Sequence, residues 1–397
     1  AVIAALAVKE AGFQVAYMAP TEILARQHFA SFTKHLHPFR ITAGLLTSSE
    51  SRKFPSKLDP SGSTSVSASQ LLTWTHDGVL DIVVGTHALI QEKVKFKNLA
   101  LVIIDEQHRF GVQQRAKLVA RGTNVKSQRI SAFSLRGSAQ QMSTPHLLSM
   151  TATPIPRTLA LTLYGDLNLS LLDEMPPGRK PVITKIVPPD KREDAYAFIR
   201  TIVQRGGQVF VICPKIEEKD DEDTDDEKKK TNSLELASVK AEFKKLSEDI
   251  FPEFAVAMLH GKMAPKEKET IIQNFRDKKN HILVSTSVIE VGMDIPNASL
   301  IMIEGAERFG LASLHQFRGR VGRAGQQAYC LLFTDSKNQK TTERLTALVK
   351  AKNGFELSEY DLQFRGSGEL SGTSQWGVSD IGMEALKNLK MVEAARA

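Results

Sequence analysis

The chain has 397 residues, of which 42% are hydrophobic and 24% are charged. This length is too great for one ordinary hydrophobic core and predicts two domains. No apolar run approaches the ~20 residues needed to span a bilayer, and no signal peptide precedes the first strand pattern, so we expect a cytoplasmic protein. The formal net charge of +7 is compatible with nucleic-acid binding, although many proteins without that function share it.

Apolar runs typical of strands alternate with helical stretches along the chain. After an opening helical pattern, AVIAALAVKEAG, such runs occupy residues 14–20, 80–86, 99–106, 146–153, 207–214, 254–261, 281–287, 299–305 and 328–333. Near-continuous apolar strands separated by helices indicate parallel sheets covered on both faces, which is the α/β class. The breakers in EMPPGRKPV divide the runs into two sets. We therefore predict two tandem domains at 1–178 and 179–335, and a shorter helical and loop element at 336–397.

Three polar stretches interrupt this pattern, and we interpret them as loops or insertions without assigned chemistry. They are residues 48–77, 121–146 and 217–231. The two cysteines, Cys213 and Cys330, each lie inside an apolar run. Buried, reduced thiols explain that placement better than a metal site or a disulfide.

Two acidic residues directly follow a buried strand pattern in the run LALVIIDEQHRFG. Asp105 and Glu106 would lie at the carboxyl end of a parallel strand, which is the edge of a sheet where ligands bind. Mg²⁺ prefers a carboxylate, waters and phosphate oxygens. Asp105 could hold Mg²⁺, directly or through water, and Glu106 could position and deprotonate an attacking water. A solvated strand end is the alternative interpretation.

A hydroxyl-rich turn and an arginine-rich segment add to this pattern. Thr151 and Thr153 end the next apolar run, where an ordinary turn is the alternative. The segment LHQFRGRVGRAGQ carries four polar residues of interest: Gln316, Arg318, Arg320 and Arg323. Glycines among them cost a helix ~1 kcal/mol each relative to alanine, so a role beyond folding is expected. Guanidinium groups suit a triphosphate, and an arginine from a second domain can accelerate phosphoryl transfer. A basic surface helix is the competing interpretation.

Taken in order, DEQH, TAT and QFRGRVGR resemble the motifs of superfamily-two helicases. The resemblance implies two tandem RecA-like domains that use ATP and Mg²⁺. The implied catalytic residues are Asp105, Glu106, Gln316, Arg320 and Arg323, with Asp105 as the metal ligand. The implied nucleotide-binding residues are Gln107, His108, Thr151, Thr153, Gly292 and Asp294.

Further matches to the same superfamily imply contacts with DNA. They are the segments APTEILARQH, VVGTHAL, LHGKM and STSVIEVGMDIPNA. The residues they carry are Pro20, Thr21, Glu22, Gly85, Thr86, His87, His260, Gly261, Ser285 and Thr286. Contacts of this kind grip the phosphate backbone and do not read the base sequence.

Longer matches narrow the resemblance to the RecG family of branched-DNA helicases. IIDEQHRFGVQQR, TATPIPRTLALTLYGDL, DEMPPGR and ERFGLASLHQFRGRVGRAG are similar to that family. The tail DLQFRGSGELSGTSQWG resembles its element that couples nucleotide state to duplex movement, with Arg365 and Gln375 as the working residues. Ser374 and Trp376 depart from the residues expected there. The implied activity is that of a monomeric ATP-dependent DNA helicase acting on stalled forks and Holliday junctions in recombination and repair.

A motor of this class needs a phosphate-binding loop, G-x-x-x-x-G-K-[ST], which the 397 residues do not contain. The opening AVIAAL resembles the helix that follows such a loop. We therefore expect the sequence to begin just after it, to lack the amino-terminal wedge domain of the family, and to bind ATP poorly as a fragment. Three alternatives stay open: a double-stranded DNA translocase similar to the transcription-repair coupling factor Mfd, an RNA helicase without the tail, and a non-catalytic nucleic-acid-binding remnant.

Overall fold

The computed structural model describes ten segments of the chain: residues 1–57, 59–107, 110, 145–152, 168–172, 174–214, 238–286, 295–323, 325–351 and 353–365. Contacts between backbone segments separate it into two compact units, 1–152 and 153–397. We call these the first and the second unit and describe each by itself.

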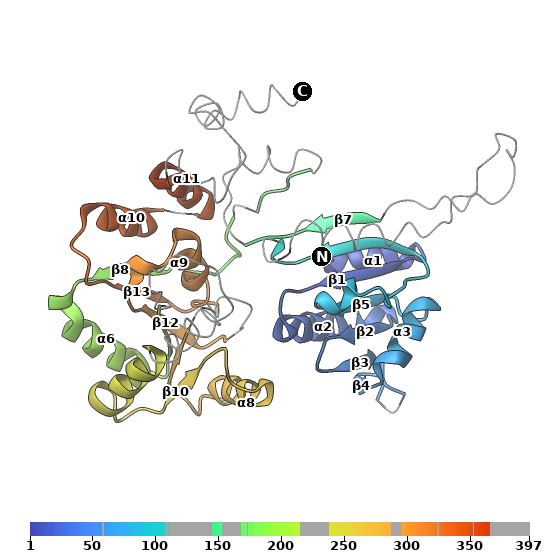
Figure 1. Ribbon diagram of the computed structural model, residues 1–397, viewed down its shortest axis with the longest axis horizontal. Coiled ribbons are helices and arrows are strands. Elements are labelled where there is room, and N and C mark those ends of the chain that lie inside the picture. Colours follow the sequence, from blue (N-terminus) through green and yellow to red (C-terminus); the bar gives the residue numbers. More distant parts are fainter. Residues whose placement is uncertain are drawn as a thin grey trace, which may run out of the picture. The chain divides into compact units, whose positions relative to one another are not determined.

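The first unit is built on a seven-stranded sheet with the order β4-β3-β2-β5-β1-β6-β7 (Figure 1). Its strands are β1 Gln14–Met18, β2 Ala43–Leu46, β3 Ser51–Phe54, β4 Thr64–Ser65, β5 Ile82–Gly85, β6 Leu99–Ile104 and β7 His146–Ser149. Neighbouring strands in the part β2-β5-β1-β6-β7 pair in parallel. In contrast, β3 pairs antiparallel with both of its neighbours, β2 and β4. Every residue of β1, β2 and β5 is buried, as expected for parallel strands that are covered on both faces.

Helices cover both faces of this sheet. They are α1 Val2–Glu10, α2 Glu22–Leu36 and α3 Ala68–His76, with short 3-10 helices η1 His37–Phe39 and η2 His87–Ile90. Successive side chains of a strand point to opposite faces. The Tyr17 ring packs against Phe32 of α2, while Met18 belongs to a core cluster with Leu71 of α3. The two helices therefore lie on opposite faces of β1.

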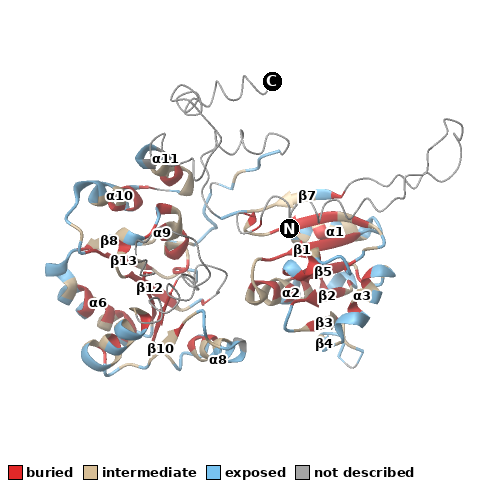
Figure 2. Ribbon diagram, viewed as in Figure 1, coloured by how far each residue is buried: buried red, intermediate tan, exposed pale blue. Residues whose placement is uncertain are grey.

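The second unit contains a six-stranded, fully parallel sheet with the order β10-β11-β9-β12-β13-β8. Its strands are β8 Ile183–Val187, β9 Gln208–Ile212, β10 Val256–Leu259, β11 Ile282–Ser285, β12 Ala298–Ile303 and β13 Tyr329–Phe333. Figure 2 shows the central strands as buried, with exposed residues gathered on the outer helices.

The helices of the second unit also lie on both faces of their sheet. They are α6 Arg192–Gln204, the π-helix η6 Lys245–Ile250, α8 Pro265–Arg276, α9 Leu311–Arg318, α10 Gln339–Lys350 and α11 Gly354–Arg365, with 3-10 helices η5 Pro189–Lys191 and η8 Ala306–Arg308. Val209 and Val211 share a core cluster with Ile199 of α6. Phe210, which lies between them on β9, packs its ring against Phe275 of α8 instead. Thus α6 and α8 cover opposite faces.

The predicted α/β class and the nine predicted strand segments are confirmed, because each apolar run contains a strand. The interpretation of 48–77 as a loop is wrong, since β3, β4 and α3 fall inside that stretch. Its strands are short and polar because they lie at an edge, so no apolar run marks them. Residues 217–231 lie outside the described part of the chain, as does most of 121–146.

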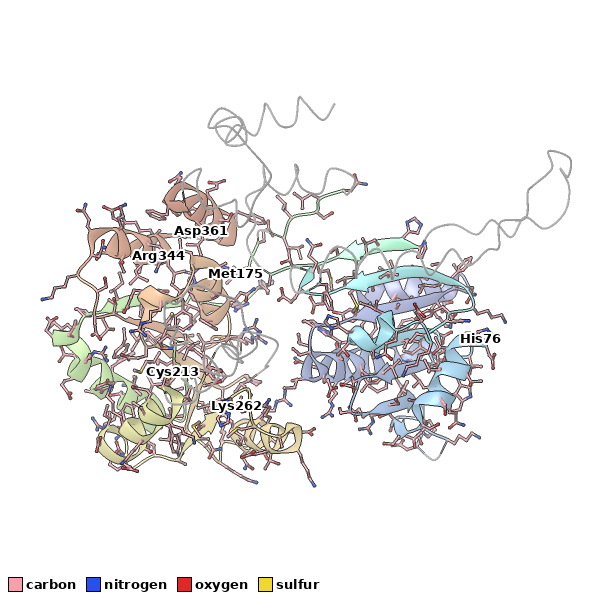
Figure 3. All side chains as sticks on the ribbon, in the orientation of Figure 1. His76, Met175, Cys213, Lys262, Arg344 and Asp361 are labelled. Atoms are coloured by element: carbon pink, nitrogen blue, oxygen red, sulfur yellow. The ribbon has the colours of Figure 1, made fainter. Side chains whose placement is uncertain are left out.

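Two further expectations concern cysteines and membranes. Both cysteines are free and buried, as predicted, and burial raises the pKa of each thiol, that of Cys330 to about 12. Figure 3 shows Cys213 among the packed side chains of the second unit. No helix in the described part of the chain has the length and apolar character needed to cross a membrane.

Candidate functional site

The carboxyl edge of the first sheet aligns several of the predicted functional residues. The strand registers pair Leu46 with Gly85, Gly85 with Met18, and Met18 with Ile104. The residues that follow these strands therefore form one row along the edge: Thr47, Thr86, Ala19 and Asp105. The acidic pair and the two first-unit segments predicted to contact DNA share this edge because parallel strands end on the same side.

Asp105 is held in place by three donors from different parts of the unit. One carboxylate oxygen, Oδ2, lies 2.9 Å from Nε2 of His28 on α2, and the other accepts the backbone N–H of Glu106 at 3.0 Å. The Tyr17 hydroxyl also bonds to Asp105, and burial next to this carboxylate raises the tyrosine pKa. Neither His28 nor Tyr17 was predicted from the sequence, although His28 ends the segment APTEILARQH.

The chemistry of Asp105 fits a Mg²⁺ ligand. It is a hard oxygen donor at a ligand-binding edge, and its side chain keeps 20% exposure despite its three protein partners. Within the described residues, His, Cys, Asp and Glu side chains form no group of three or more that could hold a metal ion alone. Beside a nucleotide Mg²⁺ favours one or two carboxylates together with waters and phosphate oxygens, and Asp105 would supply one such carboxylate.

Glu106 and Gln107 form hydrogen bonds with the end of β7 and the segment that follows it. Glu106 has a φ of 48°, a left-handed conformation that costs a non-glycine residue about 1–2 kcal/mol. Its Oε2 accepts the N–H of Ala152 at 3.3 Å. The Gln107 side chain is buried and accepts the Ser149 hydroxyl, and its backbone N–H donates to Met150 O at 3.1 Å. Such a strained residue in a buried network is typical of functional sites.

The Thr151 segment thus lies beside the acidic pair. Thr151 itself is exposed, between Met150 and Ala152, whose backbones contact this network. Its nucleotide-binding role stays a prediction, and so do the nucleotide-binding role of Gln107 and the catalytic role of Glu106. Thr153 and His108 lie outside the described residues.

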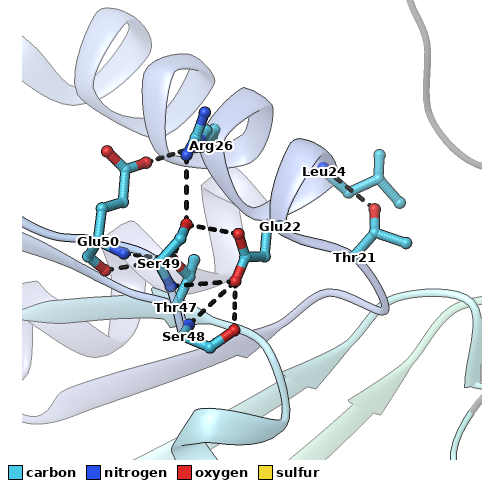
Figure 4. A network of polar contacts seen from close by, with 8 residues as sticks. All are labelled: Thr21, Glu22, Leu24, Arg26, Thr47, Ser48, Ser49 and Glu50. Carbon is cyan, nitrogen blue, oxygen red and sulfur yellow. Dashed lines mark hydrogen bonds and ion pairs between the residues drawn. The ribbon is translucent and has the colours of Figure 1, made fainter. Parts of the chain in front are cut away.

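Glu22, in the first turn of α2, holds the turn that follows β2 (Figure 4). Its Oε1 accepts the N–H groups of Ser48 and Ser49 at 3.1 and 3.2 Å and the Ser48 hydroxyl at 2.5 Å. Its Oε2 accepts the Ser49 hydroxyl at 2.5 Å. Burial raises the pKa of Glu22, but these hydrogen bonds outweigh burial and leave the pKa below its ordinary value. The DNA contact predicted for Glu22 stays a prediction.

The same turn is closed from its other side by Arg26 (Figure 4). Arg26 Nε lies 2.5 Å from Glu50 Oε1, and its Nη2 donates to the Ser49 hydroxyl at 3.3 Å. The Thr47 hydroxyl accepts the Glu50 N–H at 3.1 Å. No chemistry was predicted for this turn, because β2 has the sequence AGLL, which contains a glycine and no β-branched residue and does not stand out as a strand.

The other first-unit residues predicted to contact DNA also lie at this edge, and for some of them the local structure explains the residue type. Thr21 is the N-cap of α2 and accepts the Leu24 N–H at 3.3 Å, following Pro20. A Cβ on Gly85 would lie 2.4 Å from the backbone oxygen of Leu46, so only glycine fits there. His87 is exposed, with its ring centroid 4.9 Å from that of Phe110, whereas Thr86 is buried. Their DNA contacts stay predictions.

The carboxyl edge of the second sheet places His260 beside Thr286. Leu259 pairs with Ser285, so these two residues follow neighbouring strands. Burial lowers the pKa of His260, and Lys240, Lys268 and Lys262 lower it further, against the opposing effect of Glu267. Figure 3 labels Lys262 near this edge.

The segment around His260 is open to solvent, whereas the segment around Thr286 is buried. Lys268 Nζ donates to the carbonyl of Gly261 at 2.6 Å, and the Cβ position of Gly261 is open. Ser285 and Thr286 are buried, and the Ser285 hydroxyl donates to the Thr286 carbonyl at 3.0 Å. Their predicted DNA contacts stay predictions. Gly292 and Asp294, predicted to bind nucleotide, lie outside the described residues.

The arginine-rich segment begins in α9 but leaves the helix before its last two arginines. The helix ends at Arg318, and Gly322 takes a φ of +76° with its Cβ position 2.9 Å from Ala328 Cβ. The expectation that a helix runs through Gly319 and Gly322 is therefore wrong. Gly319 is the C-cap of α9, and Gly322 forms a tight turn that a side chain would strain. Gln316 and Arg320 are buried, at 6% and 8% exposure.

Two arginines of this segment play different parts. Arg323 is exposed after the turn. Arg318 instead anchors α9 to α10, since its Nη1 donates to Leu348 O at 2.8 Å. A phosphate-binding role fits Arg318 poorly for that reason. Of the tail residues predicted to couple movement, Arg365 ends α11 but its side chain lies outside the described part, and so does Gln375.

Two helicase families match the chain, one on each unit. The DEAD/DEAH box helicase family matches residues 1–162, and the helicase conserved C-terminal domain matches residues 191–325. The two matches follow one another along the chain, in the order that the resemblance to superfamily-two helicases predicts.

Relatives narrow this assignment to one branch. The chain is 44% identical to the ATP-dependent DNA helicase RecG of Synechocystis over 97% of its length, and 43% identical to that of Thermotoga maritima over 98%. A solved structure of RecG bound to a three-way DNA junction is 38% identical, covers 99% of the chain and superposes with a TM-score of 0.68. The chain is thus homologous to the RecG helicases along nearly its whole length. It spans only 41%, 44% and 45% of those three proteins.

Proposed function

We propose that the protein is an ATP-dependent DNA helicase or translocase that acts as a monomer on branched DNA, such as stalled forks and Holliday junctions. The alignment along nearly the whole chain with RecG helicases supports this proposal, as does the solved RecG structure, whose ligand is a three-way DNA junction. The observation that carries it is the position of Asp105 and Glu106. They lie at a ligand-binding sheet edge, in one row with the segments that grip DNA in this superfamily.

Asp105 and Glu106 would supply the chemistry of ATP hydrolysis. Asp105, oriented by His28, Tyr17 and the Glu106 N–H, would hold Mg²⁺. When bound with the nucleotide, Mg²⁺ neutralises phosphate charge. Glu106, held by the Ala152 N–H, would position the attacking water and accept its proton.

Arg320 and Arg323 would stabilise the charge that develops on the transferred phosphoryl group. Because they belong to the second unit and the acidic pair to the first, we propose that residues from both units act on one triphosphate. Loss of the terminal phosphate would remove the shared ligand and shift the population toward an open arrangement. Repetition of this cycle would move the motor along DNA.

DNA would bind through groups that recognise phosphates. Thr21, Thr86 and His87 from the first unit and the His260 segment with its lysines from the second are the proposed contacts. Hydroxyls, amides and ammonium groups of this kind bind any base sequence. The Mfd-like translocase alternative is less well supported, because the relatives described above are RecG helicases.

The test of this proposal is E106Q in the full-length protein. Gln keeps the shape of Glu106 but cannot accept a proton, so ATP turnover stimulated by DNA should fall at least ~100-fold while ATP binding persists. E248Q, which alters an exposed residue with 61% side-chain exposure, is the matched control and should retain activity. Wild-type turnover by E106Q would remove Glu106 from its assigned role.

A further inference from the structure

Arg179 lies in the segment PPGRKP and is bound to the arginine-rich loop that follows α9. Its Nη2 donates to the carbonyl of Gly319 at 3.4 Å, and its own backbone is turned by a bond from its N–H to Pro176 O at 3.2 Å. Gly178, with a φ of +81°, allows this turn. The side chain of Arg179 is therefore directed at the loop that carries Arg320 and Arg323.

The attachment extends along both segments. The Cβ position of Gly325 lies 3.4 Å from the carbonyl oxygen of Gly178, and Gln327 Nε2 donates to Pro181 O at 2.8 Å. The N–H of Ile183 then donates to Ala328 O at 3.0 Å, where β8 begins to pair with β13. The segment that divides the two sets of predicted strands is thus attached to the loop that carries the arginines.

The electrostatic situation of Arg179 is unfavourable as it stands. Its Nε is buried and has no hydrogen-bond partner within the described residues. Burial lowers the pKa of its guanidinium group, and the neighbouring positive charge of Arg323 lowers it further. A buried donor without an acceptor beside a second cation destabilises a fold unless an anion joins them. Guanidinium groups placed together in this way suit a phosphate.

We propose that Arg179 is a further phosphate-binding residue, which acts with Arg323 on the terminal phosphate of the bound nucleoside triphosphate. This inference rests on the proposed function and deepens it. A role in linker packing alone would account for the bond to Gly319, but it leaves the buried Nε without an acceptor. A phosphate of the DNA backbone is the competing anion, and the experiment separates the two.

The experiment compares affinities for Mg²⁺-ADP and for a non-hydrolysable Mg²⁺-ATP analogue in the full-length protein. R179Q removes the charge but keeps a donor for the Gly319 carbonyl, and R179K keeps the charge but loses the planar fork. R205Q is the matched control, because Arg205 is an exposed arginine at the end of α6. R323Q provides the reference signature for a residue on the terminal phosphate.

R179Q should weaken binding of the triphosphate analogue about tenfold or more while changing ADP affinity less than about twofold. R179K should weaken binding of the triphosphate analogue less than R179Q does, and R205Q should leave it unchanged. Thermal melts of each variant show whether it is folded. If R179Q does not fold, the result for R179K tests the inference. An unchanged ratio of the two affinities in R179Q and R179K would overturn the inference, as would a loss confined to DNA affinity. If R323Q also left this ratio and ATP turnover unchanged, the proposed function would fail as well.

Discussion

His315 on α9 is a histidine that its surroundings keep neutral. Burial lowers its pKa to about 4, and the positive charge of Arg318 contributes in the same direction. Arg318 Nη2 lies 3.0 Å from Nδ1 of the ring, a distance that fits a neutral imidazole accepting a hydrogen bond. Protonation of the ring would replace this bond with a repulsion between two cations.

We predict that this residue makes the stability of the second unit depend on pH. The unfolded chain binds a proton below the ordinary histidine pKa of 6.5, whereas the folded chain binds it only near 4. Stability is therefore lost as the pH falls from 6.5 to about 4, by roughly 3 kcal/mol in the free energy of unfolding, and this contribution is constant below that range. Urea unfolding of wild type and H315Q across this range measures the effect.

The H315Q variant should lack this part of the pH dependence. H76Q is the control, because His76 is an exposed histidine in the first unit with 66% side-chain exposure. If the wild-type and H315Q stabilities ran parallel between pH 6.5 and 4, the ring would not be held neutral by burial.

Single-residue chemistry could be predicted from sequence where a motif carries it, and not where the fold creates it. Asp105 and Glu106 follow an apolar strand directly, so their position at a sheet edge was predictable. His28 and Tyr17 contact Asp105 from α2 and β1, across 77 residues in the case of His28. No local pattern marks such a contact, because it depends on how the elements pack.

At the scale of elements, the contacts of Glu22 join the start of α2 to the turn after β2. Four hydrogen bonds from Ser48 and Ser49 converge on this one carboxylate, which is ionised. A carboxylate in that state repels phosphates, so we expect Glu22 to act by positioning the turn and not by direct contact with DNA.

E22Q tests this positional role. Glutamine has one acceptor oxygen and a donor group, so it cannot satisfy the same four donors, and we predict a loss of about 1–2 kcal/mol in the free energy of unfolding of the first unit. The loss should vanish at low pH, since stability from a lowered carboxyl pKa is present above the ordinary value of 4.5 and disappears as the pH falls through the folded pKa. E10Q, at an exposed residue of α1, is the control.

Denaturant unfolding at neutral pH and at pH values well below 4.5 measures both parts. Equal stability of wild type and E22Q at neutral pH would show that the network holds nothing in place. A difference that persisted at low pH would point to packing of the side chain and not to its charge.

Elements were predictable where the apolar pattern is long. The central strands, such as β6 and β12 with six residues each, stand out as apolar runs. The segments β2 and β8 do not, because β2 contains Gly44 and no β-branched residue, and β8 alternates exposed and half-buried positions at the edge of its sheet. The end of α9 at Arg318 was also missed, since glycine in a helix and glycine in a turn look alike in sequence.

At the scale of the whole molecule, the tandem α/β architecture follows from the order of strands and helices, and the comparisons agree with it. The limits of the domains are less certain from sequence. The predicted boundary at 178 rests on prolines and glycine, whereas backbone contacts divide the chain after Ala152. The bonds between PPGRKP and the loop after α9 explain the difference, because they attach that segment to the second unit.

We propose that acidic residues of the first unit and arginines of the second act on one triphosphate, and the distance between the units tests this proposal most directly. Spin labels on cysteines introduced at the exposed Lys34 and Lys279, one in each unit, report the distance between the units in the full-length protein. Cys213 and Cys330 are buried and should not react with the label. The E106Q variant keeps the nucleotide intact during the measurement.

We predict that saturating Mg²⁺-ATP shortens this distance in E106Q, whereas ADP does not, and that adding R323A abolishes the change. The same shortening in E106Q with and without R323A would contradict the account, because Arg323 would then take no part in joining the two units through the nucleotide.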